Sequence, residues 1–308
     1  MLACPPVAVP RMHDDEVDVD DALVRRLLAT QLPQLSDLPL TRIEAWGTDH
    51  AIFRLGDDLS VRLPKIGWAA KQGEKESRWL PVLAPQLPIE VPVPLVVGEP
   101  ADDYPFRWYV SPWLAGENPR PDGSVDLHQL AVDLAAFVHA LQRIDTTDAP
   151  PPKPAQRGGP LAPADGFTRD RAEQLRGETD VDALLAVWDA GLHAPPWDGP
   201  AVWVHGDLMD GNLLVRDGRL TGAIDWGGLI AGDPAVELMT AWSFFEIESR
   251  AVYRDALGFV DDAMWLRSRA WAASAAIQAL PYYRDTNPDI VARSWRAVRE
   301  VLADLERG

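Results

Sequence analysis

Hydrophobic positions in the first part of the chain predict one amphipathic helix followed by a small, mostly antiparallel sheet. Within residues 18–32, apolar side chains recur at helical spacing behind an acidic start, namely Leu23, Val24, Leu27 and Leu28. Farther along, two short apolar runs flank Gly56-Asp57-Asp58, which is typical of a hairpin turn. The elements expected here are strands at 51–55, 59–63, 91–97 and 108–111 and a helix at 68–83.

After residue 113 the pattern becomes mainly helical. The first helix of this part, at 126–143, has an apolar stripe made of Leu127, Leu130, Leu134, Phe137, Val138 and Leu141. Further helices are expected at 168–192, 233–245, 250–257, 262–282 and 289–306. A Pro-, Gly- and Ala-rich segment at 145–165 is typical of an exposed loop, which in a compact protein is more often functional than idle.

This change of pattern predicts an α+β protein with two lobes. We expect a flexible tail at 1–18, a small N-lobe built on the sheet at 19–113 and a larger, mainly helical C-lobe at 114–308. The length of 308 residues agrees with this division, because single hydrophobic cores stop growing at about 250–300 residues.

Composition excludes several classes of protein. The single cysteine, Cys4, rules out an internal disulfide framework and a multi-cysteine metal site. Neither a signal-peptide pattern nor a run of 18 apolar residues occurs, so we expect a cytoplasmic protein. The formal charge of −18 disfavours nucleic acid and membrane surfaces as partners, and it would attract a cationic small molecule. Solubility alone explains that charge equally well.

One segment carries most of the chemistry. The apolar run 202–204 leads into His205-Gly206-Asp207, and Asn212 follows Asp207 by five positions. That spacing is typical of kinase catalytic loops, in which the Asp accepts the proton of the substrate hydroxyl and the Asn holds a metal ion. We therefore expect Asp207 to be the catalytic base. His205 is an alternative base, although a His at the end of a buried strand is more often a hydrogen-bonded scaffold residue.

A predicted hairpin brings a second acidic residue towards Asn212. Asp217-Gly218 is a strong two-residue turn signal, and a regular ladder from this turn would place Asn212 opposite Ala223. Asp225 would then lie one diagonal further on the same face, about 7–8 Å away. Because Mg²⁺ takes one or two hard oxygen ligands from protein, Asn212 and Asp225 form a candidate Mg²⁺ site. Either residue alone would more often be a turn or helix cap, but their joint placement with Asp207 favours function.

Three motifs together resemble the aminoglycoside phosphotransferase family of small-molecule kinases, which share the bilobal protein-kinase fold. They are His205-Gly-Asp207 with Asn212, Ile224-Asp225-Trp226 and Gly232-Asp233-Pro234, and the likeness extends over about 20–305. The resemblance implies ATP or GTP as phosphoryl donor, Asp207 as base, and Asn212 and Asp225 as Mg²⁺ ligands. Asp233 is expected to cap the helix that starts at Pro234. Glu237 stands where an Asp is usual in the family, and we expect it to keep the packing role of that residue.

The resemblance also implies nucleotide contacts in the N-lobe. Arg62 holds the place on the third strand where most kinases have Lys, and Glu76 would be its partner on the following helix. Strand alternation places Arg62 on the face opposite to Val61 and Leu63, whereas Lys65 is the alternative cation at the strand end.

Two further N-lobe segments have expected roles. Residues 110–114, which include Ser111 and Trp113, lie where the family binds the adenine edge through backbone groups. Gly47-Thr48-Asp49-His50 lies in the phosphate-covering position, although it lacks a full glycine-rich signature.

The acceptor is left open by the sequence, since the family includes kinases for aminoglycosides, macrolides, choline and sugars. Acidic residues on the C-terminal helices are candidates for holding a cationic acceptor, with solvated surface as the alternative: Glu246, Glu248, Asp261, Asp262 and Asp285. We therefore predict a small-molecule O-phosphotransferase whose acceptors include an aminoglycoside or other antibiotic. A metabolic kinase for a choline-, sugar- or amino-alcohol-type acceptor and a catalytically silent nucleotide-binding protein are the alternatives. A protein kinase is disfavoured, because no Asp-Phe-Gly or Ala-Pro-Glu motif occurs.

Overall fold

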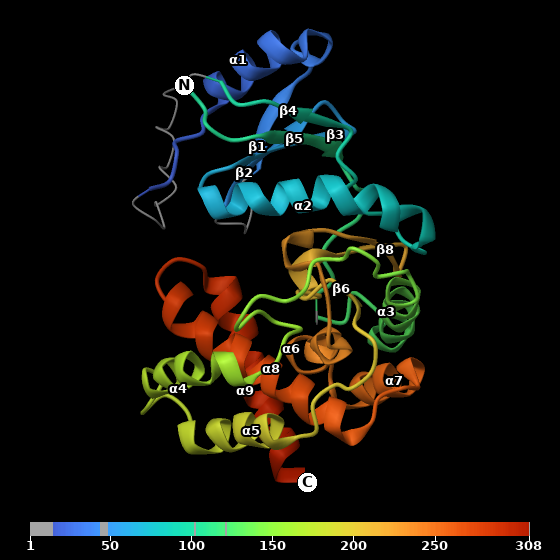
Figure 1. Ribbon diagram of the computed structural model, residues 1–308, viewed down its shortest axis with the longest axis vertical. Coiled ribbons are helices and arrows are strands. Elements are labelled where there is room, and N and C mark those ends of the chain that lie inside the picture. Colours follow the sequence, from blue (N-terminus) through green and yellow to red (C-terminus); the bar gives the residue numbers. More distant parts are fainter. Residues whose placement is uncertain (1–14, 44–48, 102, 121, 308) are drawn as a thin grey trace. The chain divides into compact units, whose positions relative to one another are not determined.

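The computed structural model describes residues 15–43, 49–101, 103–120 and 122–307, and these form two compact units (Figure 1). The first unit comprises 1–74 and 94–113, and the second comprises 75–93 and 114–308. One boundary between the units follows Trp113. In contrast to the expected division, residues 75–93 belong with the helical unit.

An antiparallel five-stranded sheet forms the centre of the first unit, in the order β1-β2-β3-β5-β4. Its strands are β1 (Leu40–Ile43), β2 (His50–Leu55), β3 (Leu59–Pro64), β4 (Val96–Gly98) and β5 (Trp108–Pro112). Helix α1 (Asp21–Gln31) is capped by Asp20, whose carboxylate accepts a hydrogen bond from Leu23 N at 2.7 Å. Its apolar stripe belongs to the same buried cluster as Val61 and Leu63 of β3, as the alternation predicts.

Two predictions for this unit were wrong. Only the end of the strand expected at 91–97 forms, because Pro92 and Pro94 have no N–H to donate to a ladder. The end of the expected flexible tail is packed on the sheet, because Val17 N donates to Lys65 O at 2.8 Å and buried Glu16 pairs with the Lys65 ammonium at 2.8 Å. Residues 1–14 of that tail lie outside the described residues.

Helices make up most of the second unit. Helix α2 (Gly67–Leu83) runs from the first unit into the second, and the others are α3 (Leu127–Gln142), α4 (Asp165–Glu173), α5 (Val181–His193), α6 (Thr240–Ser243), α7 (Ile247–Leu257), α8 (Asp262–Tyr283) and α9 (Pro288–Arg307). The helix expected at 168–192 is two helices, since Gly177 between them has a φ of 92°. None of the described helices is long and apolar enough to cross a membrane.

Short strands and 3₁₀ turns of the second unit position the motif residues. Strand β6 (Val202–Val204) pairs with β9 (Ile230–Gly232), and β7 (Leu213–Arg216) pairs with β8 (Arg219–Ala223), all antiparallel. The 3₁₀ turns are η1 (Pro33–Leu35), η2 (Ala84–Gln86), η3 (Ala162–Ala164), η4 (Asp210–Asn212), η5 (Trp226–Gly228) and η6 (Pro234–Met239). Within this unit, β6 and β8 lie at the end opposite to α4 and α5 (Figure 1).

Candidate functional site

The hairpin β7–β8 forms at the predicted turn, but its ladder is not regular. Asp217 and Gly218 both have positive φ, 53° and 75°, as a two-residue hairpin turn requires. Val215 pairs with Leu220, whereas Leu214 pairs with Gly222, so Thr221 is an extra residue in β8. The prediction that Asn212 lies opposite Ala223 was therefore wrong by one residue.

With this bulge, Asn212 is paired with the residue just before Asp225. Ile224 N donates to Asn212 O at 2.9 Å. Asp225 itself has left-handed backbone angles, with φ 60° and ψ 70°, a conformation that Asp tolerates better than most non-glycine residues. It is exposed and begins the short turn η5. Its carboxylate is thus presented by a bent backbone rather than by the straight strand that we expected.

Asp207 and Asn212 are held together in the loop between β6 and β7. The Asn212 side-chain Nδ2 donates to the backbone oxygen of Asp207 at 2.9 Å and to its carboxylate Oδ2 at 3.2 Å. Since both of these bonds use the amide nitrogen, the amide oxygen of Asn212 is directed elsewhere and suits a cation. The structure therefore brings the predicted base and one predicted metal ligand into direct contact.

His205 is a buried scaffold residue in this loop. Asp207 N donates to its Nδ1 at 3.3 Å, so the ring proton lies on Nε2, which donates to Ile224 O at 3.0 Å. Burial lowers the pKa of His205, an effect that the carboxylates of Asp207 and Asp225 oppose. Both ring nitrogens are occupied by backbone groups, which supports the scaffold interpretation over the alternative of a second base.

The carboxylate of a buried glutamate, Glu237, binds the backbone at the start of this loop. Oε1 of Glu237 accepts hydrogen bonds from His205 N and, at 3.4 Å, from Gly206 N. Its Oε2 has no hydrogen-bond partner among the described residues, and burial raises the pKa of Glu237 to about 8 against the hydrogen bonds to Oε1. We expected only a packing role for Glu237. The sequence feature that could have indicated a buried acid is its position inside the otherwise apolar run 234–239.

Asp233 has the predicted capping role. Its Oδ1 accepts from Ala235 N at 3.0 Å at the start of η6. The buried guanidinium of Arg267 also contacts both carboxylate oxygens, at 2.7 and 3.2 Å. Arg267 on α8 therefore fixes the start of η6, and with it the element that carries Glu237.

Arg157 is a site residue that the sequence did not identify. It lies in the loop that we expected at 145–165, and its Nη1 donates to Oδ1 of Asp207 at 2.5 Å. The loop was recognisable as a candidate from its composition, but no pattern distinguishes Arg157 from its neighbours. Sequence separation hides the contact, because the two residues are 50 positions apart.

Lys75 is a second cation near the motif residues. Its ammonium donates to Gly227 O at 2.5 Å. Burial lowers the pKa of Lys75 to about 8; the Glu76 carboxylate opposes this effect, Lys153 adds to it, and Asp225 again opposes it. Glu76 itself is buried. Lys75 lies on α2 and not on the third strand, where we expected the nucleotide-binding cation.

The nucleotide-contact residues expected in the first unit lie on β3 and β5. Arg62 pairs with Tyr109 in the ladder, and Lys65 is engaged by Glu16. Ser111 is buried with its carbonyl accepting from Ser60 Oγ at 3.2 Å. The predicted pairing of Arg62 with Glu76 joins residues of different units and stays a prediction.

The backbone just after β5 is partly engaged in hydrogen bonds of its own unit. Trp113 N donates to Asp58 O at 2.7 Å, so its N–H is already used within the first unit. The guanidinium of Arg54 lies 5.0 Å from the centre of the Trp113 ring. Residues 44–48, which include Gly47 and Thr48 of the expected phosphate-covering segment, lie outside the described residues.

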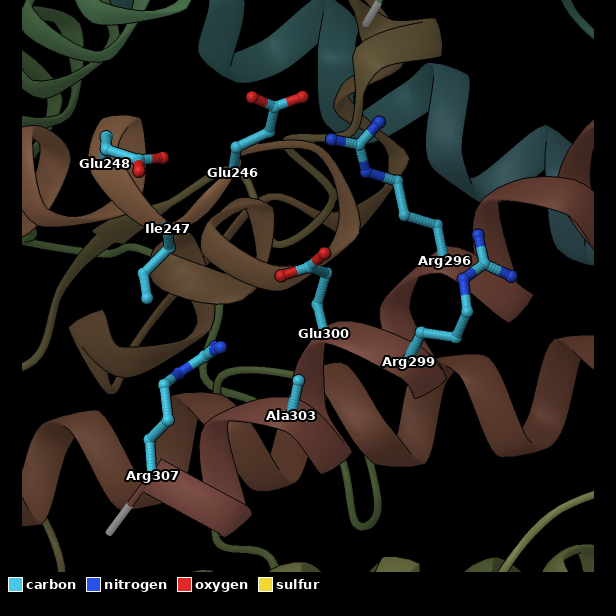
Figure 2. Close-up of a pocket in the computed structure, with 8 residues that line it drawn as sticks. All are labelled: Glu246, Ile247, Glu248, Arg296, Arg299, Glu300, Ala303 and Arg307. Atoms are coloured by element: carbon cyan, nitrogen blue, oxygen red, sulfur yellow. The ribbon is translucent and has the colours of Figure 1, made fainter.

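A groove of about 450 Å³ on the second unit contains two of the acidic residues considered for the acceptor. Figure 2 shows Glu246, Ile247 and Glu248 across from a helix that carries Arg296, Arg299, Glu300, Ala303 and Arg307. Because three arginines and three glutamates line it, the groove has mixed charge rather than the acidic lining that we expected for a cationic acceptor.

The other acidic candidates have local partners. Asp261 caps α8 by accepting from Met264 N at 2.6 Å, and Asp262 pairs with Arg254 at 2.8 Å. Asp285 follows α8 and is exposed. A role of these three residues in acceptor binding stays a prediction. Among the described residues, no group of three His, Cys, Asp or Glu side chains could hold a metal by itself.

Comparison with known proteins identifies the family and the fold of this chain. Residues 40–275 match the phosphotransferase enzyme family. The GDP and kanamycin complex of APH(2")-IIia is 19% identical, with a TM-score of 0.74 and coverage of 92% of this chain and 99% of that chain. Macrolide 2'-phosphotransferase MphH from Brachybacterium faecium is 23% identical, with a TM-score of 0.60 and coverage of 91% and 97%.

A third solved structure, ADP-bound aminoglycoside phosphotransferase APH(2'')-Ib, is 17% identical, with a TM-score of 0.58 and coverage of 92% and 98%. At these identities the likeness shows the fold, and it confirms the predicted α+β kinase-like class. No curated protein matched the sequence.

Proposed function

This chain belongs to the phosphotransferase enzyme family, and on that premise we propose that it transfers the γ-phosphoryl group of ATP or GTP to a hydroxyl of a small molecule. The observation that carries the proposal is the paired geometry of Asp207 and Asn212, five residues apart and bonded through the Asn212 amide. This pairing presents a carboxylate and an amide oxygen from one short loop, as phosphoryl transfer from a metal-bound nucleotide requires.

Asp207 is the proposed base. The acceptor oxygen attacks the γ-phosphorus, the bond from that phosphorus to the β,γ-bridging oxygen breaks, and the hydroxyl proton passes to the Asp207 carboxylate. The Asp207 side chain is 22% exposed, so a substrate can reach it although His205, Asn212 and Arg157 surround it.

Asn212 and Asp225 are the proposed Mg²⁺ ligands. Their fit rests on the donor set, because the Asn212 amide nitrogen is committed to Asp207 and leaves a hard oxygen, and Asp225 offers an exposed carboxylate. Mg²⁺ bound there would neutralise the charge that develops on the β- and γ-phosphate oxygens. Since two side chains are too few for a complete shell, the site depends on phosphate oxygens and water for the remainder.

Arg62, Glu76, Ser111 and Trp113 are the proposed nucleotide contacts. The engagement of Lys65 with buried Glu16 supports Arg62 as the cation that β3 offers to the phosphates. The planar guanidinium suits phosphate oxygens and a carboxylate at the same time. For Ser111 and Trp113 the proposed contacts are made by backbone groups at the end of β5 other than the Trp113 N–H, which donates to Asp58 O.

The acceptor class follows from the relatives only as a proposal. Solved structures of similar fold include complexes with kanamycin, gentamicin and streptomycin as well as macrolide phosphotransferases. We take hydroxyl-bearing antibiotics of these kinds as the first acceptors to test, with choline, sugars and amino alcohols as the metabolic alternative. A cytoplasmic location accords with a nucleoside triphosphate donor.

A donor and acceptor screen tests the proposal. ATP and GTP are each incubated with Mg²⁺ and with kanamycin, gentamicin, streptomycin, a macrolide, choline or a sugar, and acceptor-dependent release of ADP or GDP is measured. Mass spectrometry of the acceptor must then show one added phosphoryl group. Nucleotide binding without any transfer or hydrolysis would overturn the proposal in favour of a silent nucleotide-binding protein.

A further inference from the structure

The loop at 145–165 does not need the ion pair between Arg157 and Asp207 to hold it in place. The loop is already attached by backbone bonds, since Ala231 N donates to Pro150 O at 2.9 Å and Asp233 N donates to Gly158 O at 2.8 Å. These bonds fix the chain on both sides of Arg157 to β9 and to the residue that follows it. The backbone that carries the Arg157 guanidinium is therefore fixed independently of its contact with Asp207.

Gly158 allows the backbone next to Arg157 to pack closely against the strands β6 and β9. Its φ is 85°, and an added Cβ would lie 3.1 Å from Ile230 Cδ1 and 3.2 Å from Val204 Cγ2. The backbone next to Arg157 is thus packed against both strands of the β6–β9 pair, and only glycine fits there without strain. Because β6 leads directly into His205 and Asp207, the loop and the catalytic loop share one support.

The two donors at Asp207 restrict its carboxylate without saturating it. Oδ1 accepts from Arg157 and Oδ2 accepts from Asn212. Each carboxylate oxygen has a second lone pair, so Asp207 can still accept a proton from a hydroxyl. The two bonds hold the plane of the carboxylate, which a base needs in order to meet the acceptor hydroxyl in line with the phosphorus.

Arg157 also retains donors for a substrate. A guanidinium has five N–H groups, of which Nη1 bonds Asp207, and 35% of the Arg157 side chain is exposed. In the proposed transfer, the phosphoryl group moves to the oxygen that Asp207 deprotonates, so its equatorial oxygens pass beside the group bonded to Oδ1. Guanidinium groups stabilise charge on those oxygens in other phosphoryl-transfer enzymes.

We propose that Arg157 is a catalytic residue that binds the transferring phosphoryl group while it orients Asp207. The inference rests on the proposed function. Arg157 keeps its proton throughout, the acceptor proton goes to Asp207, and the diphosphate leaves with the electron pair of the broken bond.

The test compares Arg157→Ala and Arg157→Lys with Arg169→Ala. Arg169 is a matched control on α4, because it is also a half-exposed arginine that pairs with carboxylates, those of Asp165 and Asp189, outside the site. Turnover is measured as phosphate release from ATP and GTP with water as acceptor, and with any acceptor that the screen identifies. Thermal unfolding of each variant reports whether it is folded.

Arg157→Ala should lower turnover about 100-fold or more, the scale for loss of one donor to transition-state charge, with nucleotide affinity within a few-fold. Arg157→Lys should recover part of the loss, and added guanidinium at non-denaturing concentration should raise the turnover of Arg157→Ala alone. Arg169→Ala should keep wild-type turnover. Binding of ADP with aluminium fluoride, an analogue of the planar phosphoryl group, should weaken in Arg157→Ala while binding of ADP alone persists.

Three outcomes would overturn the inference. Turnover of Arg157→Ala equal to that of Arg169→Ala would show that the contact is structural, and faster turnover would show that it blocks the base. Unchanged affinity for ADP with aluminium fluoride would show that Arg157 does not touch the phosphoryl group. In these cases an active wild type and an inactive Asp207→Asn leave the proposed function standing, whereas a wild type inactive with every donor and acceptor overturns both.

Discussion

The buried carboxylate of Glu237 should make the stability of this protein depend on pH in an unusual direction. Burial raises its pKa from 4.5 to about 8. Because the folded state then binds a proton more tightly than the unfolded state, the stabilisation is fully present below pH 4.5 and is lost as pH rises through 8. Each unit of pKa difference corresponds to about 1.4 kcal/mol, so the complete loss is about 5 kcal/mol.

Glu237→Gln isolates this contribution. The Gln oxygen can still accept from His205 N and Gly206 N, and its amide nitrogen takes the place of Oε2, which has no partner among the described residues. The protonated wild type has a comparable donor at that position, so the two proteins should have similar stability at pH 5. At pH 8 the variant should have the larger free energy of unfolding, with the difference growing by about 3–4 kcal/mol between the two pH values.

Urea unfolding at pH 5, 6, 7 and 8 measures this difference directly. The free energy of unfolding of a domain is typically about 5–15 kcal/mol, so a change of about 3–4 kcal/mol would be readily measured. Exposed Glu248 gives the control, since Glu248→Gln should follow the wild type at every pH. Parallel curves for Glu237→Gln and the wild type would refute the reasoning, because every other titrating group is common to both proteins.

Four substitutions test the remaining assignments. Asp207→Ala should abolish transfer yet leave nucleotide affinity within a few-fold, because a base acts on the acceptor; near-normal turnover would exclude this role. Asp225→Ala should weaken nucleotide binding with Mg²⁺ more than without it, and equal titrations in the two conditions would count against a metal ligand. Arg62→Ala should raise the Michaelis constant for nucleotide and lower turnover. Lys65→Ala should mainly lower thermal stability, since Lys65 pairs with buried Glu16. The reverse pattern would contradict our choice of Arg62 as the nucleotide-binding cation.

The short-range features of the site were predictable from the sequence. A two-residue turn at Asp217-Gly218 needs only the local preference for positive φ, and the cap at Asp233 needs only the residue types on either side of it. The bulge at Thr221 was not predictable, because a strand with one more residue differs from a regular strand only in how it meets its partner. That single residue changed the partner of Asn212 from Ala223 to Ile224.

The residues missed by sequence analysis depend on contacts between distant segments. Arg157 lies in a segment with no periodic pattern, and its position follows from backbone bonds to Ala231 and Asp233, more than 70 positions farther along. The packing of Glu16 and Val17 on β3 was hidden in the same way, since the Pro- and Asp-rich composition before them predicts a tail. Local propensity cannot reveal which distant backbone group a loop will bind.

The hydrogen bonds from His205 N and Gly206 N to Glu237 have a consequence for how the site assembles. The segment from His205 to Asp225 contains the proposed base and both proposed Mg²⁺ ligands, yet the backbone at its start is held by a side chain 32 positions downstream. Contacts of such separation form late, because the intervening chain must first be ordered. A chain that stops after β8 would carry the base and Asn212 in its sequence but not the loop geometry, and during synthesis the site should take shape only after η6 has folded.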